Sequence, residues 1–138
     1  MAVHFAGCCH PLPGDRIVGI VTTGKGVTVH TVDCPSLKNY ENEPERWLDI
    51  DWGEDAEHEK HVARLKLMLS NEPGALADVA NIVAKAEANI MNLNITYRTM
   101  SYYEILLDIE VKNVEQLNAL ILSLKSSKLI SYVARATR

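Results

Sequence analysis

Three cysteines and a histidine in the first quarter of the chain are the residues best suited to hold a metal ion. Cys8 and Cys9 are adjacent, twenty residues separate Cys9 from His30, and three separate His30 from Cys34. Three thiolates and one imidazole complete a closed tetrahedral zinc site, which adds folding energy to a small unit. An odd number of cysteines, two of them adjacent, does not make a disulfide framework. The pattern favours reduced thiols or structural zinc.

The adjacent cysteines set a geometric condition on this site. Successive side chains diverge in an extended chain, so both thiols reach one ion only if the backbone bends sharply at residues 7–10. The alternative is that the cysteines are small buried residues and that His30 is a hydrogen-bonded partner. His4 and His10 are substitute ligands in the same segment. The sequence leaves both interpretations open.

A second candidate site is the loop at residues 70–76, Ser-Asn-Glu-Pro-Gly-Ala-Leu. A strand-like run precedes it and a helix-like run follows, so its backbone N–H groups converge at a helix N-terminus, where a small anion such as a carboxylate is favoured. Asparagine amides can meet the ammonium of the same zwitterion. The alternative is that Asn71 caps the helix and Asn89 occupies a turn with positive φ. The candidate ligand residues are Asn71, Glu72, Pro73, Gly74, Ala75, Leu76, Asn89, Ile90, Met91 and Asn92.

Turn-forming residues and β-branched runs organise residues 1–53 into a small β-rich unit. Strands are predicted at 3–6, 16–22, 27–31 and 46–52, with a hairpin turn at 23–26. His30 lies on the strand face opposite Val27 and Val29. A short helix is predicted to begin after Asp33, its cap, with Pro35 in the first turn. Residues 54–61 are polar and acidic, which suits a linker between two units.

Residues 62–138 alternate between strand and helix periodicities. Strands are predicted at 62–69, 90–99, 103–111 and 129–136. The first helix, 75–88, has its apolar stripe at Leu76, Val79, Ala80, Val83 and Ala86. The second begins at the cap Asn113, with Gln116 completing a capping box, and buries Val114, Leu117, Leu120, Ile121 and Leu124. In the strand after the first helix, Met91, Leu93, Ile95 and Tyr97 are predicted opposite Asn92, Asn94, Thr96 and Arg98.

This β-α-β-β-α-β order predicts an α+β fold, in which both helices cover one face of a four-stranded antiparallel sheet of strand order 4-1-3-2. The strand beginning at Ile90 is then an edge strand. A homodimer joined through that edge makes a continuous sheet. It also brings residues 89–92 of one copy close to the loop at 71–76 of the other.

Composition limits the function classes. The chain of 138 residues has 47% hydrophobic and 23% charged residues, and its formal net charge is −4. An acidic total argues against broad nucleic-acid binding through charge alone. No apolar run approaches the ~20 residues that span a bilayer, and no signal peptide is visible, so we expect a cytoplasmic protein without membrane association. No nucleophile–base pair or carboxylate dyad stands out, and the abrupt entry into structure at Val3 suggests a piece of a longer protein.

The motif Cys-Cys-His-Pro-Leu-Pro-Gly-Asp-Arg-Ile-Val-Gly at residues 8–19, with Thr-Gly-Lys-Gly-Val at 23–27 and Asp-Cys-Pro at 33–35, resembles the zinc-finger-like ribosome-intersubunit module of long Rel/SpoT enzymes. Those enzymes make and hydrolyse (p)ppGpp. The resemblance covers residues 3–53 and implies that the cysteines and His30 are candidate zinc ligands. It also implies contact with ribosomal RNA, for which His10, Arg16, Lys25 and Lys38 are the candidates. With so few cations, we expect a modest, salt-sensitive contribution.

Residues 62–138 resemble an ACT domain, the small module that binds amino acids in metabolic enzymes. The loop at 71–76, with Asn89 and Ile90, is similar to that of the valine-sensing subunits of acetohydroxyacid synthases, in which the matching Asn71, Gly74 and Asn89 belong to the effector site. Many Rel-type members have Asp-Arg before the loop glycine, where this chain has Glu72 and Pro73. The apolar lining predicts valine or isoleucine as the ligand.

The two resemblances together imply the C-terminal regulatory region of a bifunctional (p)ppGpp synthetase/hydrolase, whose catalytic half would precede it. We expect the branched-chain amino acid to bind at a dimer interface and to favour (p)ppGpp hydrolysis. The alternative is a ligand-free module for ribosome docking and dimerisation. A small zinc enzyme is disfavoured, because four protein ligands leave no open position for water.

Overall fold

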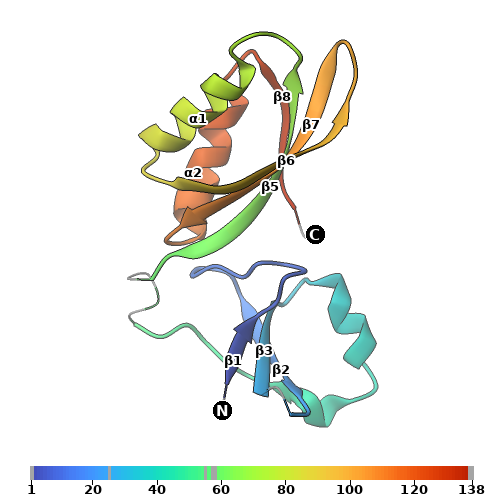
Figure 1. Cartoon of the computed structure of the whole chain (residues 1–138). Helices are drawn as coiled ribbons and strands as arrows, with labels where there is room; N and C mark the ends of the chain where they lie inside the picture. The colour runs from blue at the N-terminus through green and yellow to red at the C-terminus, as the bar shows by residue number, and fades with distance from the viewer. Residues whose placement is uncertain (1, 25, 55, 57–58, 137–138) are drawn as a thin grey trace.

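Two four-stranded sheets, one in each half of the chain, organise the fold (Figure 1). The structure, a computed structural model, describes residues 2–24, 26–54, 56 and 59–136. We call the unit built on the first sheet the N-terminal module and the unit built on the second the C-terminal module. Among the described residues, no helix has both the length and the apolar character needed to cross a lipid bilayer.

The N-terminal module has the strand order β1-β3-β2-β4. Its elements are β1 (Val3–Phe5), β2 (Ile17–Thr22), β3 (Gly26–Thr31), the 3₁₀ helices η1 (Pro35–Tyr40) and η2 (Pro44–Arg46), and β4 (Trp47–Leu48). The predicted β2–β3 hairpin is confirmed. The helix after residue 33 is a 3₁₀ helix, and its N-cap is Cys34, without a side-chain cap, rather than Asp33. The strand predicted at 46–52 is only two residues long, because η2 includes Arg46 and β2 pairs only with Trp47 and Leu48.

The C-terminal module has the strand order β6-β7-β5-β8, which is the predicted 4-1-3-2 order. Its elements are β5 (His61–Ser70), α1 (Ala75–Lys85), β6 (Asn89–Arg98), β7 (Tyr102–Val111), α2 (Val114–Lys125) and β8 (Ile130–Arg135). Both helices cover the same face of this sheet (Figure 1). The predicted βαββαβ fold is confirmed, although β5 begins at His61, a residue that the sequence assigned to the linker.

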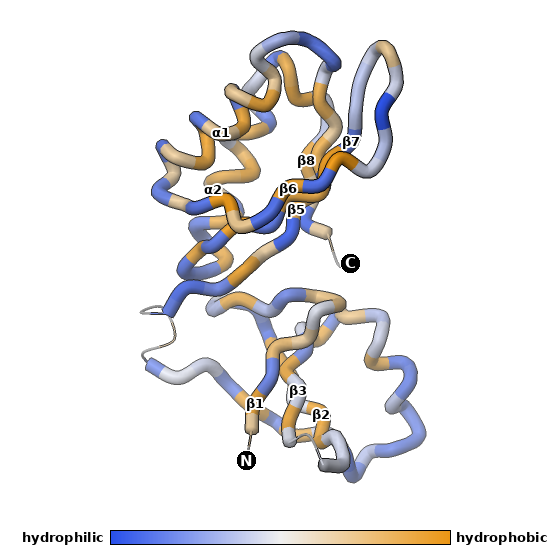
Figure 2. The backbone as a smooth tube through the Cα atoms, in the orientation of Figure 1, coloured by the Kyte–Doolittle hydropathy of each residue, from blue (hydrophilic) through white to orange (hydrophobic). Residues whose placement is uncertain are grey.

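The two helices are positioned by different signals. In α2, the Asn113 side chain accepts a hydrogen bond of 2.8 Å from the Gln116 N–H, so the predicted cap is confirmed. The Gln116 side chain accepts a hydrogen bond of 2.7 Å from the Lys112 N–H, one residue before the cap. Hydrophobic and hydrophilic residues alternate along both helices (Figure 2). In α1, however, the fully buried positions are Ala75, Val79 and Val83. The predicted stripe was therefore partly wrong, since Leu76 and Ala80 are exposed.

Strand β6 departs from the strict alternation that its sequence suggested. Its pairing with β7 shifts register between Ile90 and Asn92 and again between Ile95 and Tyr97. Each shift moves the following residues to the opposite face. Ile90 and Leu93 therefore pack against the core, whereas three residues predicted on the face of Leu93 are exposed: Met91 at 51%, Ile95 at 43% and Tyr97 at 55%.

Candidate metal centre and ligand loop

The four predicted metal ligands converge at one point of the N-terminal module. The ligand atoms of Cys8, Cys9, His30 and Cys34 all lie within 4.8 Å of one another. Cys8 Sγ is 3.3 Å from Cys34 Sγ and 3.6 Å from His30 Nδ1. A tetrahedral zinc ion with Zn–S bonds of about 2.3 Å holds its sulfur ligands roughly 3.8 Å apart. The described geometry thus matches the size of a closed four-ligand metal site.

A tight turn brings the adjacent cysteines to the same point. Residues 7–9 form a turn, and His10 takes a positive φ of 45° while its N–H donates a hydrogen bond of 3.0 Å to the Ala6 carbonyl. This is the bend that the sequence required for both thiols to face one ion. His30 arrives from β3 and Cys34 from the start of η1. The substitutes His4 and His10 are not part of the described cluster.

The environment of each ligand sets its protonation. Burial raises the pKa of the Cys9 thiol to about 12, although the Thr31 N–H donates a hydrogen bond of 3.4 Å to its sulfur. Burial also acts to raise the pKa of Cys8, but hydrogen bonds from Ser36, Cys34 and Cys9 outweigh it, and this pKa lies below the ordinary value of 9.0. Burial lowers the pKa of His30, which favours the neutral imidazole. The lowered pKa of Cys8 and the neutral imidazole of His30 suit zinc, whereas Cys9 must lose the proton that its raised pKa favours before it can bind the ion.

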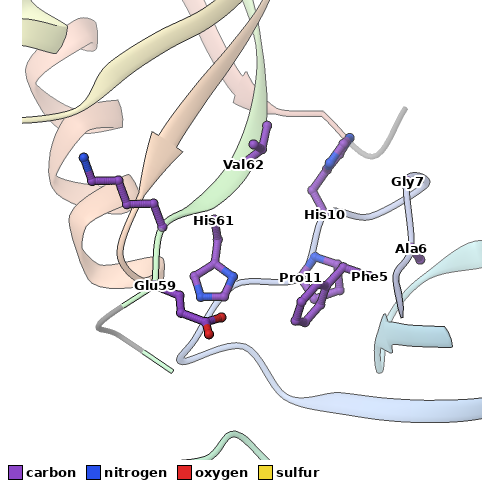
Figure 3. Close-up of a pocket in the computed structure, with 9 residues that line it drawn as sticks. Phe5, Ala6, Gly7, His10, Pro11, Glu59, His61 and Val62 are labelled. Atoms are coloured by element: carbon purple, nitrogen blue, oxygen red, sulfur yellow. The ribbon is translucent and has the colours of Figure 1, made fainter. Parts of the chain in front are cut away.

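A cavity of about 380 Å³ lies where the two modules meet (Figure 3). Phe5, Pro11 and Val62 supply apolar walls, and His10 and His61 line it as well. His61 is 7% exposed and its ring packs edge-on against Phe5. The Nε2 atom of His10 is buried and has no hydrogen-bond partner among the described residues. His10, predicted as an RNA contact, therefore has its ring largely in this junction.

The other predicted RNA contacts are placed differently. Arg16 and Lys38 are exposed, as a contact with a phosphate backbone requires. Lys25 lies outside the described residues. The structure thus leaves Arg16 and Lys38 as the described surface cations of the predicted set.

The predicted ligand loop stands open at the start of α1. Gly74 is the N-cap residue and has a left-handed φ of 91°, with no atom within 4 Å of the position that a Cβ would take. Asn71 does not cap the helix, because its side-chain amide donates a hydrogen bond of 2.7 Å to the Thr99 carbonyl. The Ser70 hydroxyl donates to the Glu72 carboxylate. The loop therefore rests on the β6–β7 turn, and residues 71–74, 76 and 77 are exposed whereas Ala75 is buried.

The second group of predicted ligand residues lies at the far end of the sheet. Asn89 belongs to β6 and does not take a positive φ, so the turn that the sequence placed there is formed by Glu87 instead. Ser70 pairs with Tyr102 whereas Asn89 pairs with Glu110, at the two ends of β7. Eight residues of extended strand correspond to roughly 27 Å. One chain therefore does not bring residues 89–92 to its own loop at 71–76.

Comparisons with known proteins assign both modules. Residues 1–53 match the RelA/SpoT RIS domain, and residues 57–135 match the ACT domain. GTP pyrophosphokinase rsh of Brucella ovis is 39% identical over 125 residues, which are 90% of this chain and 17% of that protein. The bifunctional (p)ppGpp synthase/hydrolase SpoT of Escherichia coli is 34% identical over 92 residues, 67% of this chain and 13% of that protein. The crystal structure of the ACT domain from GTP pyrophosphokinase of Chlorobium tepidum covers 56% of this chain and 99% of its own, with 19% identity and a TM-score of 0.49.

The chain belongs to the ACT domain family. More particularly, it is the RIS and ACT regulatory region of a Rel/SpoT-type protein. It spans 17% and 13% of the length of these two curated relatives. From here the N-terminal module is called the RIS module and the C-terminal module the ACT domain.

Proposed function

We propose that this chain is the regulatory region of a stringent-response (p)ppGpp synthetase/hydrolase that works in the cytoplasm, and that its ACT domain binds valine or isoleucine at a dimer interface. The observation that carries the proposal is the outward-facing loop at Gly74, next to the end of an edge strand. Asn71 holds the loop there through hydrogen bonds with Thr99 and Ser101, which lie in the turn between β6 and β7.

Two copies complete the ligand site. Strand β6 is the terminal strand of the described ACT sheet. Antiparallel pairing of β6 with the β6 of a second copy sets the start of one strand beside the end of the other. Residues 89–92 of one copy then lie close to the loop at 71–76 of its partner. Within one chain these two segments are roughly 27 Å apart, so a shared ligand site requires two copies.

The chemistry of the two segments suits a small apolar amino acid. Helix N-terminal amides near Gly74 can receive a carboxylate, and the exposed Asn89 and Asn92 amides can meet an ammonium. Leu76, which is 38% exposed, and the partly buried Ile90 supply apolar surface for a branched side chain. One methylene is worth only about 1–3 kcal/mol in such a pocket, so valine, isoleucine and leucine compete within about two decades of affinity.

Regulation follows by linkage. A ligand that binds the dimeric arrangement more tightly than the other arrangement shifts the equilibrium toward the catalytic state that the dimer supports. The size of this shift is the difference between the ligand's binding free energies for the two arrangements. Branched-chain amino acids signal sufficiency, so the favoured state is (p)ppGpp hydrolysis. Assay of the full-length protein tests this point: hydrolysis should rise with valine or isoleucine, and a rate indifferent to saturating amounts of both would contradict it.

Sedimentation velocity tests the shared site. Valine should shift the chain from monomer to dimer, because mass action stabilises the form that binds ligand. Gly74→Asp places a carboxylate at the helix N-terminus and should abolish the shift. Gly74→Ala is the matched control for backbone strain, and it should retain part of the response. Valine binding with no change in the mass distribution would refute the two-copy site.

The RIS module is proposed to hold one structural zinc ion through Cys8, Cys9, His30 and Cys34. The convergence of the four ligand atoms within 4.8 Å supports this. Zinc-loaded wild type should contain one metal per chain by mass spectrometry under native conditions. Cys34→Ser should lose it, whereas His4→Ala, on the exposed strand β1, should retain it. Equal zinc content in all three proteins would remove the assignment.

A second candidate function is ribosome docking without an amino-acid ligand. The match to the RIS domain and the exposed Arg16 and Lys38 favour contact with ribosomal RNA. Few phosphate contacts are available, so this contribution should be modest and should weaken with salt. An Arg16→Gln and Lys38→Gln variant should bind ribosomes more weakly while its response to valine stays unchanged.

A further inference from the structure

Residues 10–15 of the RIS module, which we call the docking loop, are built into the ACT domain. Leu12 has 0% exposure and belongs to the same core cluster as Leu65, Leu107 and Leu117 of the ACT domain. The Pro13 carbonyl accepts a hydrogen bond of 2.8 Å from the Val114 N–H, at the first residue of α2. The loop thus fills one end of the ACT core. It also supplies a hydrogen-bond acceptor for the first N–H group of α2, which an α-helix cannot satisfy internally.

The fit at the next residue depends on glycine. Gly14 has a φ of 101°, and a Cβ at this position would lie 2.5 Å from the Val114 Cγ1 atom. A side chain is therefore disfavoured both by the backbone conformation and by direct contact with α2. The docking loop therefore packs directly against the Val114 side chain at the start of α2.

An arginine from the last ACT strand holds the loop from the other side. Arg135 Nη1 lies 2.9 Å from Asp15 Oδ1, Nη2 lies 2.7 Å from Asp15 Oδ2, and Nη2 also donates to the His10 carbonyl at 2.8 Å. Asp15 Oδ2 accepts a further bond of 2.7 Å from the Leu12 N–H. The two side chains are only 26% and 12% exposed. Such a bidentate ion pair fixes the orientation of the two side chains as well as the distance between them.

The other end of the docking loop is attached to the candidate metal centre. Cys9 immediately precedes His10, and its sulfur accepts a hydrogen bond from the Thr31 N–H. One peptide bond therefore separates a metal ligand from the first residue that Arg135 contacts. A shift of the cysteine turn cannot leave Leu12, Pro13 and Asp15 in place without straining the segment between them.

We infer that the end of the ACT domain formed by the start of α2 and the end of β8 is a socket for the docking loop, and that metal binding in the RIS module keeps this socket filled. This inference rests on the zinc site proposed above. Coupling of this kind is reciprocal, so a filled socket also raises the metal affinity of the RIS module. The ACT domain thereby senses whether the RIS module is metal-loaded and folded.

Hydrogen exchange on the whole chain tests the coupling. Removal of zinc with a chelator should raise the exchange rate of the amides at the start of α2, Val114 above all, by about tenfold or more, because opening of the socket exposes them. The same amides should recover when zinc is restored. If the chain loses zinc and the exchange rates in α2 and β8 do not change, the coupling is refuted but the metal site is not. A chain that takes up no zinc would overturn the metal site and the coupling together.

Two variants separate coupling from general loss of stability. Arg135→Gln removes the pair that crosses the junction. Lys66→Gln removes a pair within the ACT sheet, where Lys66 Nζ lies 3.1 Å from Glu104 Oε1 and the two side chains are 46% and 23% exposed. In Arg135→Gln the start of α2 should exchange fast with or without zinc, and zinc affinity should fall. Lys66→Gln should keep the full response to zinc. A zinc response that is equal in the two variants would exclude Arg135 as the coupling residue.

Discussion

At the scale of single residues, Leu12 is the side chain whose role the sequence concealed. It lies in a Pro-Leu-Pro-Gly turn, a pattern that predicts an exposed loop, yet the ACT core covers it completely. No local signal reveals this burial, because the residues of the core cluster that contains Leu12 begin at Ala63, in the other module. The candidate metal ligands are the opposite case, since residue type and spacing named these four side chains, with His4 and His10 as substitutes, and the fold brings the four together.

Leu12→Ala should lower the free energy of unfolding of the ACT domain by about 2–5 kcal/mol, as expected for a fully buried leucine that leaves a cavity. Denaturant titration followed by ACT-domain exchange or fluorescence measures it. The matched control is Leu122→Ala, at a position that is 70% exposed, where the change should stay within about 0.5 kcal/mol. Equal effects from the two substitutions would place Leu12 outside the ACT core.

The two adjacent cysteines should differ in reactivity when metal is absent. The thiolate is the nucleophile, so the lowered pKa of Cys8 and the raised pKa of Cys9, about 12, predict faster alkylation of Cys8 near pH 8. Mass spectrometry of iodoacetamide-treated, metal-free protein measures the order. Equal alkylation rates for Cys8 and Cys9 would contradict the assigned environments.

Between pH 9 and 12, unfolded Cys9 releases its proton while folded Cys9 keeps it, so the free energy of unfolding of the metal-free chain should fall as the pH rises.

At the scale of elements, the sequence predicted the identity and order of every ACT strand and helix, because each has one clear period. The prediction of which residues are buried failed where tertiary packing overrides the hydrophobic periodicity. Two register shifts in β6 depend on pairing with β7, and the buried stripe of α1 is rotated toward Ala75 by its contact with the sheet. In the RIS module the short β4 carries too few residues for any period to show.

The start of α2 provides a prediction at this scale. Asn113→Ala removes the acceptor of the Gln116 N–H and should lower the free energy of unfolding by about 1 kcal/mol. Asn118→Ala, on the exposed face of the same helix, should be neutral or slightly stabilising, because alanine is the better helix former. Thermal denaturation of the two variants beside wild type measures the difference. A neutral Asn113→Ala would mean that the docking loop alone secures this helix end.

At the scale of the whole molecule, the docking loop packs the RIS module against the ACT domain. The docking loop joins the candidate metal centre to α2 and β8, while the ligand loop and the edge strand β6 lie on other parts of the ACT domain. The proposed zinc site and the proposed amino-acid site therefore lie in different parts of the chain, and separate variants can disturb each of them. The sequence predicted each module, but the junction between them came from the structure alone.

Calorimetric titration of the zinc-loaded chain with single amino acids tests the central claim most directly. Valine and isoleucine should each give a saturable heat, with affinities within about two decades of each other, and Gly74→Asp should remove both. The contradicting result is no heat from either amino acid while an aromatic or acidic amino acid binds. Absence of heat from all of them would favour the ligand-free docking module instead.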